Sequence, residues 1–380
     1  MNKNSKLTWA ALSALLFSTL GAACGDDSCS PPVSTPQHKS PEPQCPPPAP
    51  TPACPPRCDE PPAGMIIDDC NSGCKIITPN AGPRICMGAD VFITADFILW
   101  APREEGLEFA MTGASGVVTN QGNLYEPDFG LEPGFKVGLG LNLGHDGWDV
   151  FAEYTWLATD VDETISSSTM VDLWAQSINA TANRLRGRWD SNFNILDLEL
   201  GRNFFVSQYL TLRPHYGLKG TWQNQNYTIT ADIDPAGNLI TRNTYDFDFD
   251  YWGFGIRTGV DTAWHFTKRW SIFGNFAISA LWSGFDVERK DSTLVAATDS
   301  ITATANTKND FHTILPVLEL AIGLRWETWL SNDDYHFGID AGWEEQVWWG
   351  MNRMIVLGQP QRDNGDLTFQ GLTLKFRFDF

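Results

Sequence analysis

Long apolar runs are nearly absent from this 380-residue chain. The longest, Leu7 to Leu20, lies near the start and is too short for a confident membrane-spanning helix. A chain without such runs can cross a membrane only with β-strands that close into a barrel. Basic residues are also scarce, at 26 Lys and Arg against 46 Asp and Glu, so the formal net charge is -20. This charge argues against a nucleic-acid partner, because phosphates attract basic surfaces.

Cysteine is absent after residue 86, which restricts any disulfide to the beginning of the chain. In an exported protein such clustered cysteines indicate disulfides, either within the segment, between copies of the chain or to other envelope proteins. Zinc is the competing interpretation, but only His38 lies nearby and the spacings match no common zinc module. The disulfide candidates are Cys24, Cys29, Cys45, Cys54, Cys58, Cys70, Cys74 and Cys86.

The first 88 residues divide into two segments. Residues 1–23 have the basic start, short apolar run and small residues of a secretory signal peptide. A retained anchor helix and lipidation of Cys24 are the alternatives, and Gly21 three residues earlier weakens the second. Residues 24–88 hold most of the prolines and predict an extended periplasmic tail or linker without a core of its own.

Residues 89–380 show the alternation of apolar and polar residues that is typical of β-strands. In "GFKVGLGLNLG", for example, Phe135, Val137 and Leu139 share one face, and the Asp-Gly dipeptide that follows predicts a hairpin. The pattern predicts an all-β fold, an antiparallel transmembrane barrel of about ten strands, with twelve possible. A soluble sandwich or barrel is the alternative, since alternation alone does not tell which solvent faces the apolar side.

The lengths of the connections favour a membrane barrel. Short turns are expected at 144–147, 206–208, 267–269 and 331–334, and long loops at 102–130, 160–191, 224–245, 284–312 and 350–366. Outer-membrane barrels sort their connections in this way, with the short turns on the periplasmic side. Aromatic residues at strand ends also favour a membrane barrel, because Trp and Tyr are enriched at the interface between membrane and water. They are Trp148, Trp156, Trp222, Trp252, Trp264, Trp270, Trp282, Trp326 and Trp343.

The sequences of two of the long loops predict local structure within them. "NYTITADIDPAGNLITRNTY" reads as two arms of a hairpin that projects beyond the membrane. The spacing of Leu173, Ile178 and Leu185 predicts a short surface helix, with a helix folded into the pore as the alternative.

The chain ends on the alternating stretch "GLTLKFRFDF", with Phe380 as its last residue. We expect this strand to pair with the one that begins near Asp90, because a closed barrel has no free edge. In outer-membrane proteins generally, an aromatic last residue is recognised by the barrel assembly machinery. Phe380 is therefore the predicted assembly signal, and the machinery and outer-membrane lipid are predicted partners.

Three stretches resemble the major outer-membrane protein family of Legionella and its relatives among chlamydiae: "ADVFITADFILWAPREEGLEFA", "GFKVGLGLNLGHDGWDVFAEYTWL" and "LDLELGRNFFVSQYLTLRPHYGLKGTWQNQNY". In that family a strand ending in W-x-x-R-E-x-G-L-x-(F/Y)-A opens the barrel, as Trp100 to Ala110 do here. The resemblance covers most of residues 88–380 and implies a pore-forming barrel in the outer membrane of a Gram-negative-type bacterium. The Cys/Pro-rich segment departs from the family pattern, and only its composition is similar to cross-linked envelopes of chlamydia-like bacteria.

The leading functional hypothesis is a porin for passive diffusion of ions or small solutes. The alternative is a structural envelope anchor whose narrow barrel is plugged by opposite charges. We expect no enzyme, cofactor or metal site, because the histidines look isolated and no catalytic motif appears. The predicted pore-lining residues are Asp96, Lys136, Glu153, Asp197, Glu199, Arg213, Lys219, Arg257, Asp261, Glu319, Arg325, Asp340, Glu344, Lys375 and Arg377.

Overall fold

The computed structural model describes residues 80–83, 85, 90–112, 122–143, 146–175, 181–233, 239–331, 333–357 and 365–380. The predicted signal peptide, all eight cysteines and most of the predicted tail lie outside these residues. The described chain consists of strands: β1 (Val91–Glu104), β2 (Ala110–Thr112), β3 (Asn123–Tyr125), β4 (Glu132–Asn142), β5 (Trp148–Asp172), β6 (Thr181–Arg202), β7 (Phe204–Phe205), β8 (Leu210–Ile233), β9 (Thr241–His265), β10 (Trp270–Val295), β11 (Ser300–Leu330), β12 (Tyr335–Trp348) and β13 (Leu367–Asp379).

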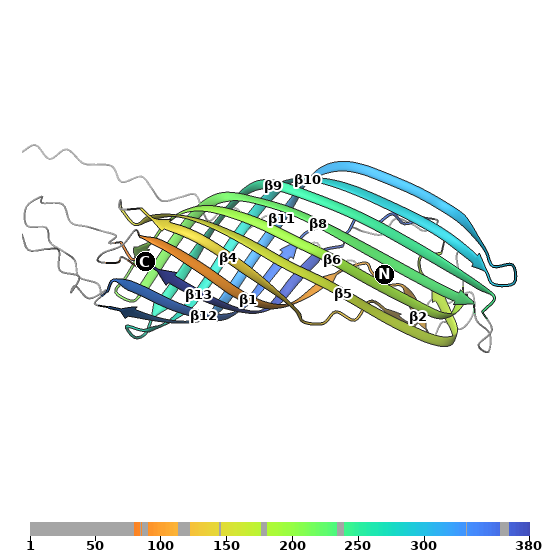
Figure 1. Ribbon diagram of the computed structural model, residues 1–380, viewed down its shortest axis with the longest axis horizontal. Helices are drawn as coiled ribbons and strands as arrows, with labels where there is room; N and C mark the ends of the chain where they lie inside the picture. Colours follow the sequence, from red (N-terminus) through yellow and green to blue (C-terminus); the bar gives the residue numbers. More distant parts are fainter. Residues whose placement is uncertain are drawn as a thin grey trace, which may run out of the picture. The chain divides into compact units, whose positions relative to one another are not determined.

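Ten of these strands close into an antiparallel ring (Figure 1). The order around the ring is β1, β4, β5, β6, β8, β9, β10, β11, β12 and β13, and β13 pairs back with β1 from Phe92 opposite Asp379 to Glu104 opposite Leu367. The short strands β2, β3 and β7 lie outside the ring and pair with β5, β2 and β8. The predicted ten-stranded antiparallel barrel is confirmed, and so is the pairing of its last strand with its first.

The predicted short turns all lie on one rim of the ring. The turn from β4 to β5 ends on Asp146 and Gly147, whose φ angles of 53° and 74° are left-handed, as the Asp-Gly hairpin signal requires. A Cβ on Gly147 would lie 2.6 Å from the carbonyl oxygen of Asn203, so glycine is also needed for space. The side chain of Arg202 holds the turn by pairing with Asp146 at 2.9 Å.

The predicted long loops differ more from the structure. Three of them, 160–191, 224–245 and 284–312, consist mostly of strand, because the hairpins β5–β6, β8–β9 and β10–β11 continue far beyond their neighbours. The two arms expected in the second of these loops are confirmed as the paired ends of β8 and β9, as far as Ile233 opposite Thr241. Backbone pairing along these hairpins satisfies the N–H and C=O groups that a long irregular loop would expose.

The helix predicted around Leu173 and Leu185 is wrong. β5 runs to Asp172, and Leu185 lies in β6, paired with Ile165 of β5. Ile178 lies outside the described residues. Leu173 follows the end of β5, so the apolar spacing that suggested a helix joins residues of different segments. Among the described residues there is no helix that is long and apolar enough to cross a membrane.

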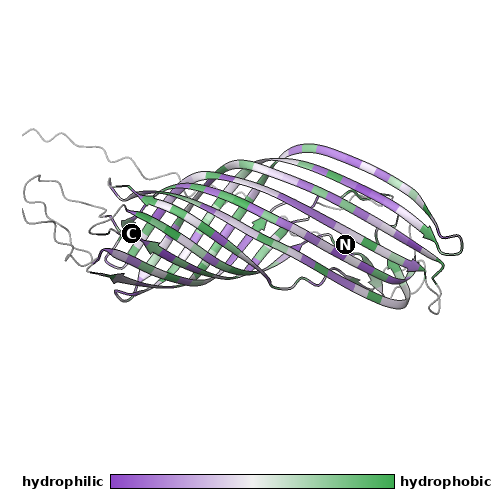
Figure 2. Cartoon of the chain, in the orientation of Figure 1, coloured by the Kyte–Doolittle hydropathy of each residue, from purple (hydrophilic) through white to green (hydrophobic). Residues whose placement is uncertain are grey.

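The outward face carries an apolar band on the half of the barrel next to the short turns. On β10, for instance, Ile272, Phe276 and Ile278 point outward between Trp270 and Trp282, and all five are more than a third exposed. The twelve steps from Trp270 to Trp282 rise about 30 Å along the membrane normal, at about 3.3 Å per residue and a strand tilt of roughly 40°. Beyond the band the outward residues become charged, and Figure 2 shows hydrophilic stretches on the projecting hairpins. This pattern is that of a transmembrane β-barrel.

The inward face is divided in the same direction into a charged half and an apolar half. On β1, for example, Asp96 faces inward near the middle, and Trp100 is fully buried towards the far end. In the far half the wall consists of the six long strands β5, β6, β8, β9, β10 and β11, with β2 and β3 added at the edge of β5. The other strands end earlier, because β4 stops pairing with β5 at Leu157 and β12 starts pairing with β11 at Val317. The projecting sheet carries its apolar core on its inner side, where loop residues such as Leu107 and Met351 are buried.

Candidate functional site

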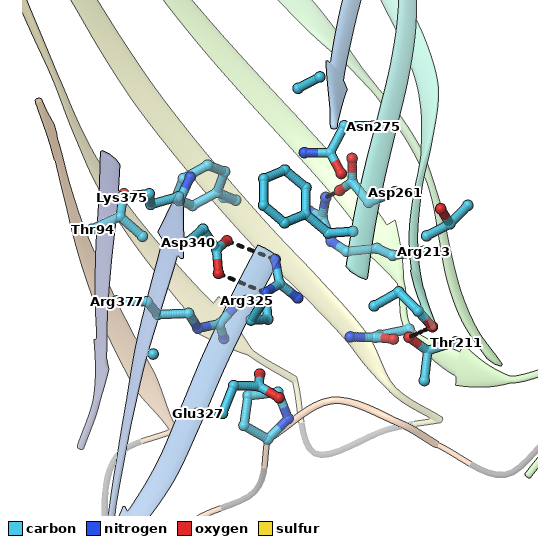
Figure 3. A pocket seen from close by; sticks show the side chains of 18 of the residues that line it. Thr94, Thr211, Arg213, Asp261, Asn275, Arg325, Glu327, Asp340, Lys375 and Arg377 are labelled. Atoms are coloured by element: carbon cyan, nitrogen blue, oxygen red, sulfur yellow. Dashed lines mark hydrogen bonds and ion pairs between the residues drawn. The ribbon is translucent and has the colours of Figure 1, made fainter. Parts of the chain in front are cut away.

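A large cavity occupies the charged half of the barrel. It measures about 1350 Å³ and reaches the turn rim, where Asp146, Asn203 and Lys268 line it. Fourteen of the fifteen predicted pore-lining residues line this cavity, and the fifteenth, Lys219, is fully buried beside it. Figure 3 shows some of them projecting from different strands into the same space. Alternation thus identified the inward-facing charges, and their role in conduction stays a prediction.

One group of charges connects the strands on one side of the lumen. We call it the lumen cluster, and it consists of Asp149, Asp197, Glu199, Asp261, Glu319, Arg213, Lys219 and Arg257. Arg213 of β8 contacts Asp149 at 2.6 Å, Glu199 at 2.9 Å and Asp261 at 2.8 Å. Lys219 contacts Asp197 at 2.9 Å and Glu319 of β11 at 3.0 Å, which links strands separated by two others. Arg257 completes the cluster by pairing with Glu199 and with Glu319.

A second group connects the other side of the lumen. Lys136 of β4 pairs with Glu344 of β12 at 2.7 Å, and Lys375 of β13 pairs with Glu153 of β5 at 3.0 Å. Asp96 lies 3.7 Å from Lys375. The pairs Lys136–Glu344 and Lys375–Glu153 each span two intervening strands of the ring, whereas Asp96 and Lys375 lie on neighbouring strands. Because both groups reach across the wall, the ion pairs narrow the lumen in addition to lining it.

The apolar half of the barrel closes the lumen beyond the charges. Phe193 packs on Trp348 and Phe369, with ring centroids 5.3 and 4.3 Å apart. The chain after β1 folds into this core, where the Tyr227 hydroxyl donates to the carbonyl of Leu107 at 2.5 Å. A solute that enters from the turn rim therefore meets this packed core.

Arg289 holds two chain segments in this core. It lies on β10 and is fully buried, and its guanidinium pairs with Asp291 at 2.7 Å. It also donates to the carbonyl oxygens of Trp174, at 2.7 Å, and of Ile355, at 3.0 Å. The guanidinium lies 5.1 Å from the ring centre of Phe247, within range of a cation–π contact. One side chain therefore fixes the chain after β5 and the chain before β13 against the sheet.

The predicted pore-lining set omits several inward residues. Asp149 belongs to the lumen cluster and shares the parity of Glu153 on β5, so the alternation could have identified it. His215 looked isolated in the sequence, yet its ring lies 3.7 Å from Glu199 and 3.9 Å from Asp261, on the two neighbouring strands. Arg289 was placed in a predicted loop, although the alternation of β10 continues through it.

The two ends of the barrel domain meet at the turn rim. Phe380 is partly exposed there, and its backbone exchanges hydrogen bonds with Val91 at 2.9 and 3.2 Å. Asn80 forms a bridge with Phe204, and the Ala81 N–H donates to the carbonyl of Asn203 at 3.2 Å. Residues 80 and 81, which precede β1 in the chain, therefore lie against the rim that carries the short turns.

Comparison with known families agrees with this architecture. Residues 86–380 match the family model described as Legionella pneumophila major outer membrane protein precursor. The chain belongs to this family. The predicted resemblance is thereby confirmed, and the barrel is an outer-membrane protein. A search of curated protein sequences gives no significant match.

Solved structures of other outer-membrane barrels show distant similarity. The outer membrane protease OmpT of Escherichia coli has 10% sequence identity and a TM-score of 0.38, and the match covers 76% of this chain and 96% of that one. The toluene transporter TodX of Pseudomonas putida has 10% identity and a TM-score of 0.28, with 77% and 90% covered. Ail of Yersinia pestis, titled an attachment invasion locus protein, has 10% identity and a TM-score of 0.23, with 77% and 99% covered.

Proposed function

We propose that this outer-membrane barrel is a channel for passive diffusion of ions or small polar solutes, and that the described conformation is its closed form. The observation that carries the proposal is the cavity of about 1350 Å³, which reaches the turn rim and is lined by charges of both signs. Such a wall favours hydrated ions and polar solutes, and the local field of its charges sets selectivity. Opening then requires the apolar core to leave the far half of the barrel.

A structural envelope anchor is the second candidate, and the same closure favours it. Ion pairs such as Lys219 with Glu319 link strands across the lumen, and Phe193, Trp348 and Phe369 fill the barrel beyond them. Side chains alone can fill the interior of a narrow barrel. The two candidates differ in one measurable property, which is whether the barrel conducts.

The proposal extends to the first 88 residues as a cleaved signal peptide and a periplasmic, cysteine-rich tail that cross-links the envelope. The contact of Ala81 with Asn203 at the turn rim supports a periplasmic tail, since short turns face the periplasm in barrels of this type. Non-reducing gels of cell envelopes test the cross-linking. We expect high-molecular-mass species that reductant converts to monomer, and a reductant-insensitive monomer alone would reject this use of the tail.

Single-channel recording in planar bilayers tests the channel. Lys375 lines the cavity and is partly exposed to it, so Lys375→Gln should shift the reversal potential towards cations. Lys308→Gln is the matched control, because Lys308 is 58% exposed on the outward face and pairs with Asp286 there. Lys219 would be a poor choice, since it is 0% exposed and its loss would disturb folding.

The outcome separates the two candidate functions. A channel predicts conductance in the wild type and in both variants, with a shifted reversal potential in Lys375→Gln alone. Absence of conductance in all three folded, inserted proteins would reject the channel and favour the anchor. An equal shift in Lys308→Gln would show that selectivity is not set inside the cavity.

A further inference from the structure

Three potential metal ligands meet in the lumen from three neighbouring strands. Glu199 of β6, His215 of β8 and Asp261 of β9 each offer one ligand atom, and these atoms lie within 4.8 Å of one another. His215 Nδ1 lies 3.7 Å from Glu199 Oε2, and its Nε2 lies 3.9 Å from Asp261 Oδ1. An imidazole nitrogen with two carboxylates is a ligand set that suits zinc and related divalent transition metals.

His215 itself points to a missing partner. Its side chain is 1% exposed, and Nδ1 has no hydrogen-bond partner among the described residues. A buried polar atom without a partner lowers the stability of the folded state. The ring is nevertheless firmly placed, because it packs over Gly259, where a Cβ would lie 2.6 Å from Nε2. The structure thus holds the imidazole between two carboxylates, with Nδ1 towards Glu199 and Nε2 towards Asp261, and leaves Nδ1 without a hydrogen bond from the described residues.

The charge of the surroundings favours a bound cation. The lumen cluster has five carboxylates and three cationic groups, so it carries two excess negative charges while His215 is neutral. The group on the other side of the lumen, with Asp96, Glu153 and Glu344 against Lys136 and Lys375, has no spare cation either. Uncompensated charge in a buried site is costly, and one divalent ion would neutralise the excess.

The arginines leave room for such an ion. Arg213 donates to Asp261 Oδ2, and Asp261 Oδ1 accepts no hydrogen bond from the described residues. Glu199 accepts from Arg213 and Arg257, but each carboxylate oxygen has two lone pairs and can accept a hydrogen bond while it coordinates a metal. Glu199 and Asp261 both line the cavity that reaches the turn rim, which provides an entry path.

We propose that Glu199, His215 and Asp261 bind a divalent transition-metal ion of the zinc type inside the barrel. Three protein ligands leave the fourth position of a tetrahedral site to water from the cavity. The bound ion would link β6, β8 and β9 at the level of the ion pairs. This proposal is independent of conduction, since a permanently closed barrel would bind the ion equally well.

Metal titration of the full-length protein in detergent tests the proposal. The cysteines are first alkylated, because eight thiols could bind zinc by themselves, and metal is removed with a chelator. Calorimetry should then report about one Zn²⁺ per chain, and Co²⁺ should give the visible absorption of a tetrahedral site. His215→Gln should weaken binding at least tenfold, judged from the 10–100-fold effects that even outer-shell partners of metal ligands have.

Two further variants keep the test decisive. His312→Gln removes an exposed histidine on the outward face and should bind zinc as the wild type does. Asp261→Asn weakens one ligand, on a side chain that is only half-buried. Its zinc affinity replaces that of His215→Gln if the histidine variant does not fold, which heat-modifiable migration in gels reports. Three results would each overturn the proposal. The wild type would bind no zinc, a folded ligand variant would bind zinc as tightly as the wild type, or the wild type would bind Mg²⁺ as tightly as zinc.

Discussion

Arg289→Ala should release the segment that ends the apolar core before β13. In the wild type the guanidinium pairs with Asp291 at 2.7 Å and donates to the Ile355 carbonyl at 3.0 Å. The substitution removes the charge that neutralises Asp291, which is 2% exposed, and it removes a donor from a carbonyl of the 351–356 segment. Both losses act on the closed conformation and not on the membrane-embedded part of the barrel.

The expected magnitude follows from the burial of this pair. Breaking a buried ion pair by removing one partner costs about 3–5 kcal/mol, and the lower value applies if water reaches Asp291 after the change. A loss of about 3 kcal/mol in the local opening free energy raises the open population about 150-fold. Opening is the step that makes a folded segment accessible to protease.

Trypsin reports this opening, because Arg353 lies within the segment. In the closed form its Nε donates to the Gly350 carbonyl at 2.9 Å, and its guanidinium lies 6.0 Å from the ring centre of Phe285. Cleavage after Arg353, followed by mass spectrometry, should accelerate about 150-fold in Arg289→Ala. Arg188→Ala is the control, since Arg188 is 50% exposed and pairs with the exposed Asp160. Cleavage within threefold of the wild-type rate in Arg289→Ala would refute the reasoning.

Two further predictions concern the ends of β1 and β13. Glu104 lies at the end of β1, beyond the exposed Arg103, and burial raises its pKa to about 8. The folded state therefore keeps a proton that the unfolded chain loses near pH 4.5, so stability falls as the pH rises from about 4.5 to 8. Glu104→Gln should remove this fall in urea unfolding at several pH values, and parallel pH profiles would contradict it. Deletion of Phe380 should lower the yield of membrane-inserted barrel while the inserted molecules keep wild-type conductance; an unchanged yield would argue against Phe380 as an assembly signal.

Much of the membrane-embedded barrel could be predicted from alternation. In the band, lipid and lumen differ sharply in polarity, so residues such as Glu319, which faces inward on β11, and Leu320, which faces outward, show their orientation by their sequence parity. The Asp-Gly turn at Asp146 and Gly147 was predictable because it needs left-handed backbone angles. The inward charges followed from the same parity.

The projecting hairpins could not be predicted in this way. Beyond the band the surroundings of both sheet faces change. The outward face contacts water in place of lipid, and the inward face contacts an apolar core in place of the polar lumen. Polar residues therefore point outward and apolar residues inward in this part of the sheet, as Asp286 and Val287 show. In the sequence this stretch has the composition of a polar loop. The helix predicted from Leu173 and Leu185 failed because Leu173 follows the end of β5 while Leu185 lies within β6, so their spacing does not belong to one element.

The sequence by itself determined the strands of the membrane band, the turn rim and the parity of the lumen charges there, because these depend on neighbours within the chain and on the solvent of each face. Only the tertiary structure decided which charges meet. Arg213 and Asp149 are 64 residues apart, and Lys136 and Glu344 are 208 apart. Their contact depends on strand register and on ring closure, which no local pattern encodes. The same closure brings His215 between Glu199 and Asp261 and seals the lumen with an apolar core.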